Sequence, residues 1–328
     1  MQIALLSNPD SGRKKQLRKI IELAKTNANI SYFLASNTEQ FIQFVEKIRQ
    51  CPVDLVVINA GDGTIQALLT QMFARLPEMP VLAILKGGTT NMTAGDVGIR
   101  GSNVSGLKKL IALNQPLQPS LRTETRPILK IDWDSALSPV CGLFFGAGAI
   151  IEGQDYFHST IHKKGLRDSI GPALSALRLL FSLNNKQQTL FSPVQMQMTG
   201  WDAQNPADES SARPVIQTSG EHLVAFASGL ERLFVGIHPF WGACNGDWYF
   251  SAVQHQPTGY SLLRLLPLFV GKPSPDMLQQ QWLFSTKLNR LEIHMEGEFT
   301  VDGERYRTTR ENPLITVTLA GYANFLQL

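Results

Sequence analysis

The stretch Asp54-Leu-Val-Val-Ile-Asn-Ala-Gly-Asp-Gly-Thr64 predicts the fold of the N-terminal part of the chain. Its apolar, β-branched run is typical of a strand buried on both faces of a parallel sheet. A helical period follows at once and makes Thr64 the expected N-cap; its apolar positions are Ile65, Leu68, Leu69, Met72 and Leu76. Asp62 therefore lies between two glycines, where a strand ends and a helix begins. In open α/β sheets this position is the ligand crevice.

The surroundings expected for Asp62 favour an anion together with a cation. Glycines at 61 and 63 allow another group to approach the backbone closely, and the N–H groups at a helix start attract negative charge. An acidic side chain in such a place fits a phosphate chain that carries Mg²⁺. The alternative is a hairpin turn, because Asp-Gly is a common turn pair. The helical period after Thr64 argues against the hairpin.

Length and composition indicate a globular chain of about two domains. The 328 residues are 43% apolar and 17% charged, so a sizeable core is available. The net charge of +3 is compatible with phosphate ligands or an anionic surface. No run of Lys and Arg exceeds three residues, and we therefore expect no nucleic-acid partner.

The cysteines and the apolar runs bear on the cellular compartment. Cys51, Cys141 and Cys244 are scattered, which predicts reduced thiols and neither a disulfide framework nor a zinc site. The first residues lack the features of a signal peptide, and no apolar run reaches the roughly 20 residues that a membrane-spanning helix needs. These observations predict a cytoplasmic protein.

Hydrophobic patterning divides the chain into two parts. Strand-like runs at 2–7, 30–34, 53–58 and 80–85 alternate with helical periods, as in a doubly wound α/β domain, and Asn37 or Thr38 is the expected cap of the second helix. Beyond about residue 118, short strand-like runs predict an antiparallel β-sandwich, at 128–131, 143–145, 194–198, 223–227, 233–237, 248–253, 291–295 and 315–319. A helix is expected at 174–181 and a long exposed loop at 200–220. We expect an α/β nucleotide-binding domain at 1–120, a β-sandwich substrate domain at 121–308, and packing of 309–328 back onto the first domain.

Four motifs occur in a defined order along the chain. They are Asn8-Pro-Asp-Ser-Gly12, Ala60-Gly-Asp-Gly-Thr64, Lys86-Gly-Gly-Thr-Thr-Asn91 with Ala94, and Asp302-Gly-Glu304. This order resembles the diacylglycerol kinase catalytic domain superfamily, which includes sphingosine kinases and bacterial soluble lipid kinases. The resemblance implies an NAD kinase-like N-terminal domain, ATP as donor, Mg²⁺ as cofactor, and a lipid alcohol such as diacylglycerol as acceptor. The absence of a G-x-x-x-x-G-K-[ST] motif excludes the usual P-loop.

The resemblance also implies roles for particular residues. It places Asp62 beside the nucleotide phosphates as a catalytic and metal-binding group, and Asp302 and Glu304 at the cleft, one of them as candidate general base. The residues expected to bind ATP are Asn8, Ser11, Gly12, Gly61, Asp62, Gly63, Thr64, Gly88, Thr89, Asn91, Lys164 and Arg167. Two alternatives stay open. Asp302-Gly-Glu304 could be an ordinary hairpin turn, and Lys164 and Arg167 could belong to a solvated basic turn.

The sequence departs from the superfamily pattern at several positions. Ala60 replaces a glycine, where its methyl group could crowd the loop or fit if the backbone needs no positive φ. Lys86 replaces a proline and could add a phosphate contact. The segment 146–151 lacks an expected aspartate, for which Glu152 or Asp155 could substitute. Asn245 removes a charge from a second metal motif, which puts a structural Mg²⁺ in doubt.

The leading functional hypothesis is a lipid kinase that contacts the membrane peripherally. Candidate side chains for this contact, each with a core position as the alternative, are Phe240, Trp241, Leu262, Leu263, Leu265, Leu266, Leu268 and Phe269. The competing hypotheses are an NAD kinase-like enzyme and a nucleotide-binding module with weak or lost catalysis. The oligomeric state is left open, with a homodimer as one option.

Overall fold

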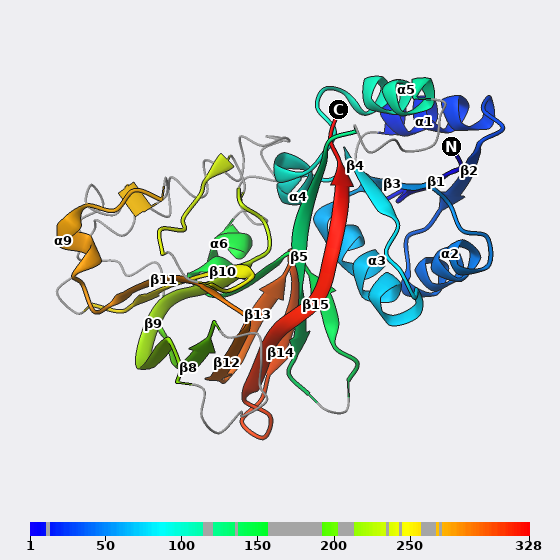
Figure 1. Cartoon of the computed structure of the whole chain (residues 1–328). Helices are drawn as coiled ribbons and strands as arrows, with labels where there is room; N and C mark the ends of the chain where they lie inside the picture. Colours follow the sequence, from blue (N-terminus) through cyan, green and yellow to red (C-terminus); the bar gives the residue numbers. More distant parts are fainter. Residues whose placement is uncertain are drawn as a thin grey trace. The chain divides into compact units, whose positions relative to one another are not determined.

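The chain forms two compact units. The computed structural model describes residues 1–10, 14–113, 121–134, 137–156, 192–202, 213–233, 236–242, 245–256, 267–268 and 271–328 (Figure 1). One unit comprises Met1–Ile128 and Ala320–Leu328, and the other comprises Leu129–Leu319. The chain passes from unit to unit inside two long strands, β5 (Thr123–Asp132) and β15 (Leu314–Leu326), so neither crossing is a linker of turn residues.

The first unit contains a parallel sheet. Its strands are β1 (Ile3–Ser7), β2 (Ile30–Leu34), β3 (Leu55–Ala60) and β4 (Val81–Lys86), in the order β2-β1-β3-β4. The end of β15 pairs with β4 in parallel, at Phe325 and Leu82. Every residue of β1 and β3 is buried, whereas the edge strand β2 is partly exposed. The uninterrupted apolar run in β3 thus marks a central strand covered on both faces.

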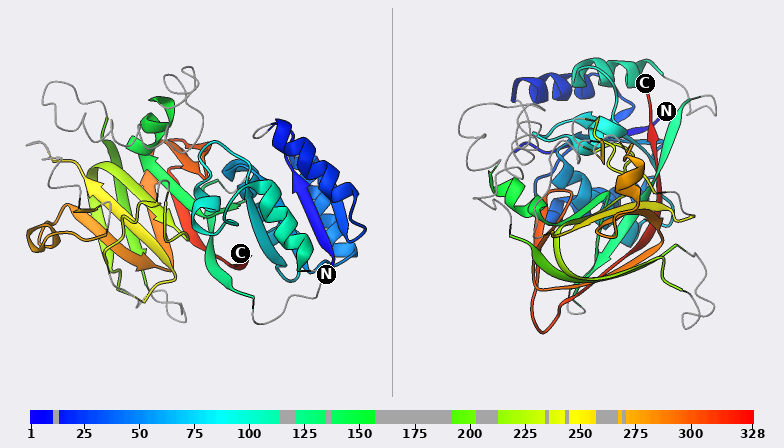
Figure 2. Two further views of the ribbon diagram at one scale, coloured as in Figure 1. Left: turned by 90° about the horizontal axis from the view of Figure 1, so that it is seen from above. Right: turned by 90° about the vertical axis from the view of Figure 1, so that its left-hand side faces the viewer.

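Helices cover both faces of this sheet. Helices α1 (Lys14–Lys25) and α5 (Asn103–Ala112) pack together over one face, and α2 (Thr38–Gln50) and α3 (Asp62–Arg75) over the other (Figures 1 and 2). Asn37 caps α2 by accepting from the Gln40 N–H at 3.0 Å. The prediction of Thr64 as the N-cap of α3 was wrong. Gly61 is the cap and Thr64 lies in the first turn, because the backbone becomes helical as soon as the extended Gly61 ends.

The second unit is built from antiparallel strands. In addition to parts of β5 and β15, this unit contains the strands β6 (Val140–Gly142), β7 (Phe144–Gly148), β8 (Val194–Trp201), β9 (Ile216–Ser228), β10 (Trp248–Gln254), β11 (Leu283–Leu288), β12 (Arg290–Met295), β13 (Gly297–Val301) and β14 (Glu304–Thr308). Their main order is β14-β13-β7-β9-β8-β12-β15, and β10 pairs with β9 and β11. Aromatic side chains such as Trp248, Phe250 and Phe299 fill its core. The expected class, an N-terminal parallel α/β layer followed by antiparallel strands, is confirmed.

Several local expectations differ from the structure. Residues 216–220, expected in an exposed loop, begin β9 and pair with Met196–Gly200 of β8, a partnership that local composition does not reveal. A strand was expected at 233–237, of which residues 234 and 235 lie outside the described residues; the Leu233 N–H donates to the Ile237 carbonyl at 2.8 Å, and neither of these two residues lies in a strand. The short helices α6 (Ala149–Tyr156) and α9 (Pro275–Leu278) were not foreseen.

Some predicted elements cannot be compared with the structure. The helix expected at 174–181 and residues 203–212 of the loop expected at 200–220 lie outside the described residues. Within the described ranges, no helix has the length and the apolar character needed to cross a bilayer.

Candidate active site

Two glycine-rich loops meet where adjacent parallel strands of the first unit end. The last residues of β3 and β4, Ala60 and Lys86, are paired, and the Gly87 N–H donates to the Ala60 carbonyl at 3.2 Å. A Cβ atom at residue 87 would lie 2.4 Å from the Ala60 nitrogen, and one at residue 88 would lie 2.6 Å from the Gly61 Cα. Only glycine permits this contact between the two backbones.

Ala60 fits the loop that its methyl group could have crowded. Its side chain is buried, and its backbone has no positive φ, the conformation that would require a glycine. The departure of Ala60 from the superfamily pattern is therefore compatible with this loop structure.

Asparagine side chains shape the same loops. The Asn8 Nδ2 group donates to the Thr64 hydroxyl at 2.8 Å, which joins the loop after β1 to the first turn of α3. Asn91 adopts a left-handed backbone conformation, with φ of 50°, and its side chain exchanges two hydrogen bonds with the backbone of Gly88. These amides hold the loops in shape, and Thr89 is left exposed beside them.

Asp62 connects the loop after β3 to the loop after β4. Its side chain is 9% exposed, and its two oxygens accept the backbone N–H groups of Met92 at 3.0 Å and Thr93 at 2.9 Å. It thereby caps the short helix α4 (Met92–Asp96). Burial raises the pKa of the Asp62 carboxyl above its usual range, and the hydrogen bonds from Thr93 and Met92 partly offset that effect.

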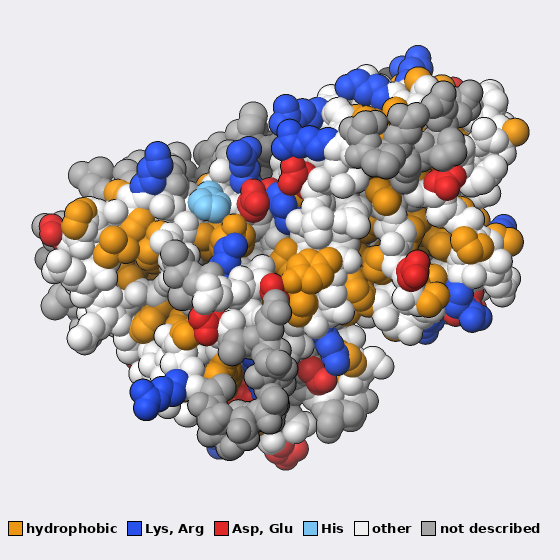
Figure 3. Space-filling model, viewed as in Figure 1, with side chains coloured by type: hydrophobic (Ala, Val, Ile, Leu, Met, Phe, Trp, Pro, Cys, Tyr) orange, Lys and Arg blue, Asp and Glu red, His pale blue; other side chains and the backbone are white. Residues whose placement is uncertain are grey.

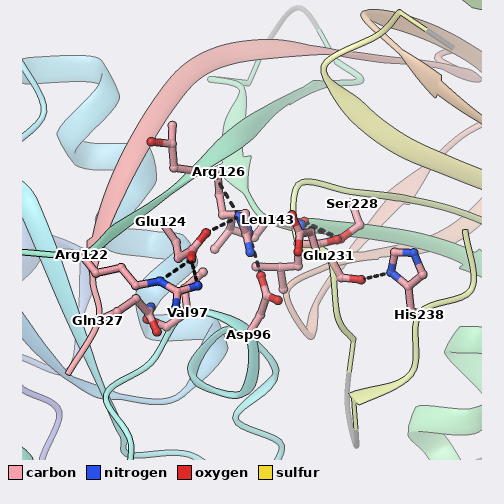
Figure 4. Close-up of polar contacts among 12 residues, drawn as sticks. Asp96, Val97, Arg122, Glu124, Arg126, Leu143, Ser228, Glu231, His238 and Gln327 are labelled. Carbon is pink, nitrogen blue, oxygen red and sulfur yellow. Dashed lines mark hydrogen bonds and ion pairs between the residues drawn. The ribbon is translucent and has the colours of Figure 1, made fainter. Parts of the chain in front are cut away.

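The other end of α4 is also anchored, by residues that no sequence motif indicated. The guanidinium group of Arg126, on β5, donates to the Asp96 carboxylate at 2.8 Å, and the exposed fractions of the two side chains are 8% and 2% (Figure 4). The Gln327 amide donates to the Val97 carbonyl at 2.7 Å. Removing one partner of a buried ion pair is strongly destabilising, so this pair fixes α4 and the loop before it.

A buried amide network lies below the loops. The Asn103 side chain, at the start of α5, bonds to the backbone N–H and carbonyl of Lys86 and donates to the Asn59 side chain at 3.1 Å. The Asn59 side chain in turn donates to the Ser7 hydroxyl at 3.1 Å. The polar Asn59 inside an apolar strand was the sequence signal that could have indicated this network.

In the second unit, Asp302 and Gly303 form the turn between β13 and β14. Asp302 has φ of 48° and Gly303 has φ of 97°, and Val301 pairs with Glu304 across the turn. The Asp302 side chain is 3% exposed, and it accepts the Leu143 N–H at 2.8 Å. The alternative of an ordinary hairpin turn thus describes the backbone correctly, although the carboxylate points into the protein.

Glu304 differs from Asp302 because its side chain is exposed. The neighbouring Arg305 bonds to Asp155 at 2.7 Å and to the Ile151 carbonyl at 3.1 Å, both in α6. Glu152 accepts the Ser192 N–H at 3.1 Å. The two acidic residues that could replace the missing aspartate therefore take part in contacts around α6. Which of Asp302 and Glu304 acts as a base stays a prediction.

The phosphate and metal groups implied by the resemblance fit the described residues to different degrees. Helix α3 begins without a side-chain cap, so its first N–H groups suit a phosphate. Among the described residues, no three His, Cys, Asp or Glu side chains are grouped as a protein-held metal would need. Asp62 can offer one ligand to a Mg²⁺ ion whose other ligands are phosphates and water. Ser11, Gly12, Lys164 and Arg167 lie outside the described residues.

Comparison with known proteins finds a family likeness in the N-terminal part of the chain. Residues 2–118 match the family model of the diacylglycerol kinase catalytic domain, which confirms the resemblance drawn from the motifs. A probable lipid kinase YegS-like protein of Klebsiella pneumoniae is 31% identical over 108 residues. That match covers 33% of this chain and 36% of the relative, so the chain spans about a third of the length of the curated relative it matches.

Solved structures resemble the chain over nearly its whole length. A diacylglycerol kinase of Bacillus anthracis aligns with a TM-score of 0.59 at 15% identity, covering 99% of this chain and 96% of that one. A putative diacylglycerol kinase of the same organism aligns with a TM-score of 0.64 at 16% identity, with the same coverage. At such identities the likeness establishes the fold.

Proposed function

We propose that the chain is an ATP-dependent lipid kinase, which transfers the γ-phosphate of ATP to the hydroxyl group of a lipid such as diacylglycerol. One observation carries the proposal. Three motif loops follow adjacent parallel strands, and two of them touch backbone to backbone beside the uncapped start of α3. Phosphoryl transfer is mostly positioning and charge stabilisation, for which preformed loops are suited. The family match of residues 2–118 supports the same activity.

In this proposal the loops bind the phosphates of ATP. The first N–H groups of α3 and the Gly61 N–H donate to phosphate oxygens, and the exposed hydroxyl of Thr89 adds a contact. Bound Mg²⁺ would neutralise phosphate charge during transfer. Asp62 would offer it one oxygen; its other role is to hold α4 against the loop, and Asn8 and Asn91 keep the loops in shape.

The chemical step moves one phosphoryl group and one proton. The acceptor oxygen forms a bond to the γ-phosphorus, the bond from that phosphorus to the bridging oxygen breaks, and ADP leaves with the electron pair. The acceptor proton passes to a carboxylate, and the sequence motifs predict that this carboxylate is Asp302 or Glu304.

The test is an assay with γ-labelled ATP and Mg²⁺ against diacylglycerol, phosphatidylglycerol and a sphingoid base, with NAD as a further acceptor. We expect label to appear in an extracted lipid. Label in NADP alone would identify the NAD kinase alternative. Saturable ATP binding without transfer to any acceptor would identify a nucleotide-binding module.

Access to a lipid acceptor requires contact with a membrane surface, and we propose a peripheral, cytoplasmic location. The side chains that were expected to contact the membrane are not all exposed. Phe240 and Leu268 are buried, and Trp241 is partly buried. Leu262, Leu263, Leu265, Leu266 and Phe269 lie outside the described residues. Hydrophobic side chains on the face in Figure 3 form separate patches between polar groups. Sedimentation with diacylglycerol-containing vesicles would test this contact.

A further inference from the structure

Polar residues at the ends of three adjacent strands of the first unit are joined by one chain of hydrogen bonds. Ser7 ends β1, Asn59 is the next-to-last residue of β3, and Lys86 ends β4. Each stands at the start of a motif loop, because Asn8 follows Ser7, Ala60 follows Asn59, and Lys86 opens the third motif. The chain of hydrogen bonds therefore connects the points from which the three proposed phosphate loops leave the sheet.

Asn103, the first residue of α5, is the centre of this chain. Its Oδ1 accepts the Lys86 N–H at 3.0 Å, and its Nδ2 donates to the Lys86 carbonyl at 2.8 Å and to the Asn59 Oδ1 at 3.1 Å. A backbone N–H can only donate, so the atom that faces it must be the amide oxygen, and this orientation directs both Nδ2 protons at acceptors. The Asn103 amide thus uses its oxygen and both of its N–H bonds.

The Asn103 side chain takes the place of a strand at the outer edge of β4. Along this edge, the end of β15 pairs at Leu82, and the Ile99 N–H donates to the Ile84 carbonyl at 2.9 Å. At the next position the Asn103 amide binds both the N–H and the carbonyl of Lys86, as a neighbouring backbone would. On its other edge Lys86 pairs with β3. The residue before the third motif's glycines is therefore fixed from both sides.

The hydrogen-bonded chain is buried and continues to β1. The Asn59 Nδ2 group donates to the Ser7 hydroxyl at 3.1 Å, and the exposed fractions are 0% for Ser7 and 6% for both Asn59 and Asn103. Stability alone does not call for these groups, because apolar residues of similar shape in place of both partners of a hydrogen bond can be nearly neutral. A buried polar network with satisfied partners instead fixes one arrangement of the segments that carry it.

We propose that Asn103 is a positioning residue for phosphoryl transfer, which sets the spacing of the phosphate loops through Lys86 and Asn59. The inference rests on the proposed kinase function, because the loops in question are those assigned to ATP. Asn103 acts through backbone groups and does not touch the nucleotide. The two loops have no slack between them, since a Cβ atom at Gly88 would lie 2.6 Å from the Gly61 Cα. A small shift of Lys86 therefore changes the surface that the phosphates meet.

The first test is Asn103→Ala, which removes all three hydrogen bonds of the side chain. Calorimetric titration of the full chain with ATP and Mg²⁺, at a temperature where the variant is folded, should show a Kd raised about tenfold. Steady-state kinetics should show kcat/KM for ATP lowered by about 10²-fold, as expected for misplaced binding groups. The KM of the lipid acceptor should stay unchanged, because the shifted loops bind the nucleotide.

The conservative variant Asn103→Asp supplies a rescue. The introduced carboxylate keeps the size and the acceptor of the amide, but it lacks the donors and faces the Lys86 carbonyl. Protonation restores one donor, and burial favours the protonated form. The ratio of this variant's Kd for ATP to that of the wild type should therefore fall as the pH is lowered from about 8 to about 5. A ratio that stays constant or rises would contradict the role of the two donors.

The matched control is Asn289→Ala in the second unit. The Asn289 side chain also accepts a backbone N–H, that of Asp247 at 2.9 Å, and donates to the Asp247 carboxylate at 3.0 Å. This variant should lower Tm and leave the Kd for ATP unchanged. An equal loss of ATP affinity in Asn289→Ala would show that general destabilisation causes the effect, and it would overturn the inference.

Ser7→Ala keeps the test decisive if the Asn103 variants do not fold. It removes one hydroxyl at the far end of the chain of hydrogen bonds, and it should raise the Kd for ATP about two- to fivefold. Wild-type ATP affinity in folded Asn103→Ala, or in Ser7→Ala if Asn103→Ala does not fold, would overturn the inference and leave the proposed function standing. A wild-type protein that binds no ATP would overturn both.

Discussion

The dipeptide Asp-Gly occurs at both proposed catalytic positions, and the two copies have opposite backbone structures. Asp62 and Gly63 start helix α3, while Asp302 and Gly303 form a two-residue hairpin turn in which both φ angles are positive. The residues after each pair account for the difference. An apolar helical period comes after Gly63, and an alternating strand comes after Gly303.

The Asp62 and Asp302 carboxylates nevertheless have similar structural roles, each within its own unit. Each is buried and accepts backbone N–H groups from a segment far along the chain, Met92 and Thr93 in one case and Leu143 in the other. A short acidic side chain beside a glycine can thus tie a turn to a distant strand or helix. The comparison shows that burial of an aspartate in a loop motif has a structural explanation alongside the catalytic one.

The largest expected effect is on the rate of lipid phosphorylation, and it should show whether Asp302 or its exposed neighbour Glu304 is the general base. Removing the base, by Asp302→Asn or Glu304→Gln, should lower lipid phosphorylation by about 10²–10⁴ and leave ATP affinity nearly unchanged. Only the variant that removes the base should lose the acidic limb of the pH–rate profile. Glu298→Gln, an exposed glutamate on the same hairpin, is the matched control.

Steady-state kinetics beside calorimetric ATP titration would check this prediction for each variant. Full activity in both variants, or parallel loss of ATP binding and activity, would show that the general base is not a residue of this turn.

The next effect concerns Asp62. Asp62→Asn should reduce turnover by on the order of 10²-fold or more, because it removes a charge beside the proposed phosphates and Mg²⁺. The asparagine oxygen can accept only one of the two backbone N–H groups that Asp62 accepts, so the free energy of unfolding should also fall, by about 1–3 kcal/mol. Glu78→Gln, which changes an exposed carboxylate beyond the C-terminal end of α3, serves as the control. A wild-type rate for Asp62→Asn would leave Asp62 with its structural role alone.

The pH dependence of stability gives a smaller and independent test of Asp62. Burial raises its pKa, so the folded protein keeps this proton at pH values where the unfolded chain has lost it. The resulting stability is present below the ordinary carboxyl pKa of about 3.9 and is lost as the pH rises through the folded-state pKa. Relative to Asp62→Asn, the wild type should therefore lose free energy of unfolding as the pH rises towards neutral. Urea denaturation of both proteins across this range measures the difference, and parallel curves would contradict it.

The smallest effect compares the two glycines directly. Gly303→Ala should lower the free energy of unfolding by about 1 kcal/mol or more, because alanine is strained at φ of 97°. Gly63→Ala should instead raise it by about 0.4–1 kcal/mol, because alanine suits a helix better than glycine. Thermal unfolding of both variants without ligand would show opposite shifts of Tm. Shifts of the same sign would contradict the structural difference between the two Asp-Gly pairs.

The sequence by itself determined the main strands and helices of the first unit and the chemistry of its loops. A few neighbouring residues are enough to indicate the structure at three places: the apolar run before Asn59, the helical period after Thr64, and the glycines at 87 and 88. Strand type, helix type and close backbone approach are local properties, so local patterns were sufficient to predict them. The same patterns located Asp62 at a strand end, and the motif order indicated the superfamily.

Only the tertiary structure decided which groups these residues meet. Asp62 accepts from residues 30 and 31 positions away, and Asp302 from a residue 159 positions away. The pair of Arg126 with Asp96, the amide network of Asn59 and Asn103, and the pairing of β8 with β9 also join distant segments. Such partners follow from strand order and register, which bring remote backbone groups together, and a local pattern contains no information about the distance between them.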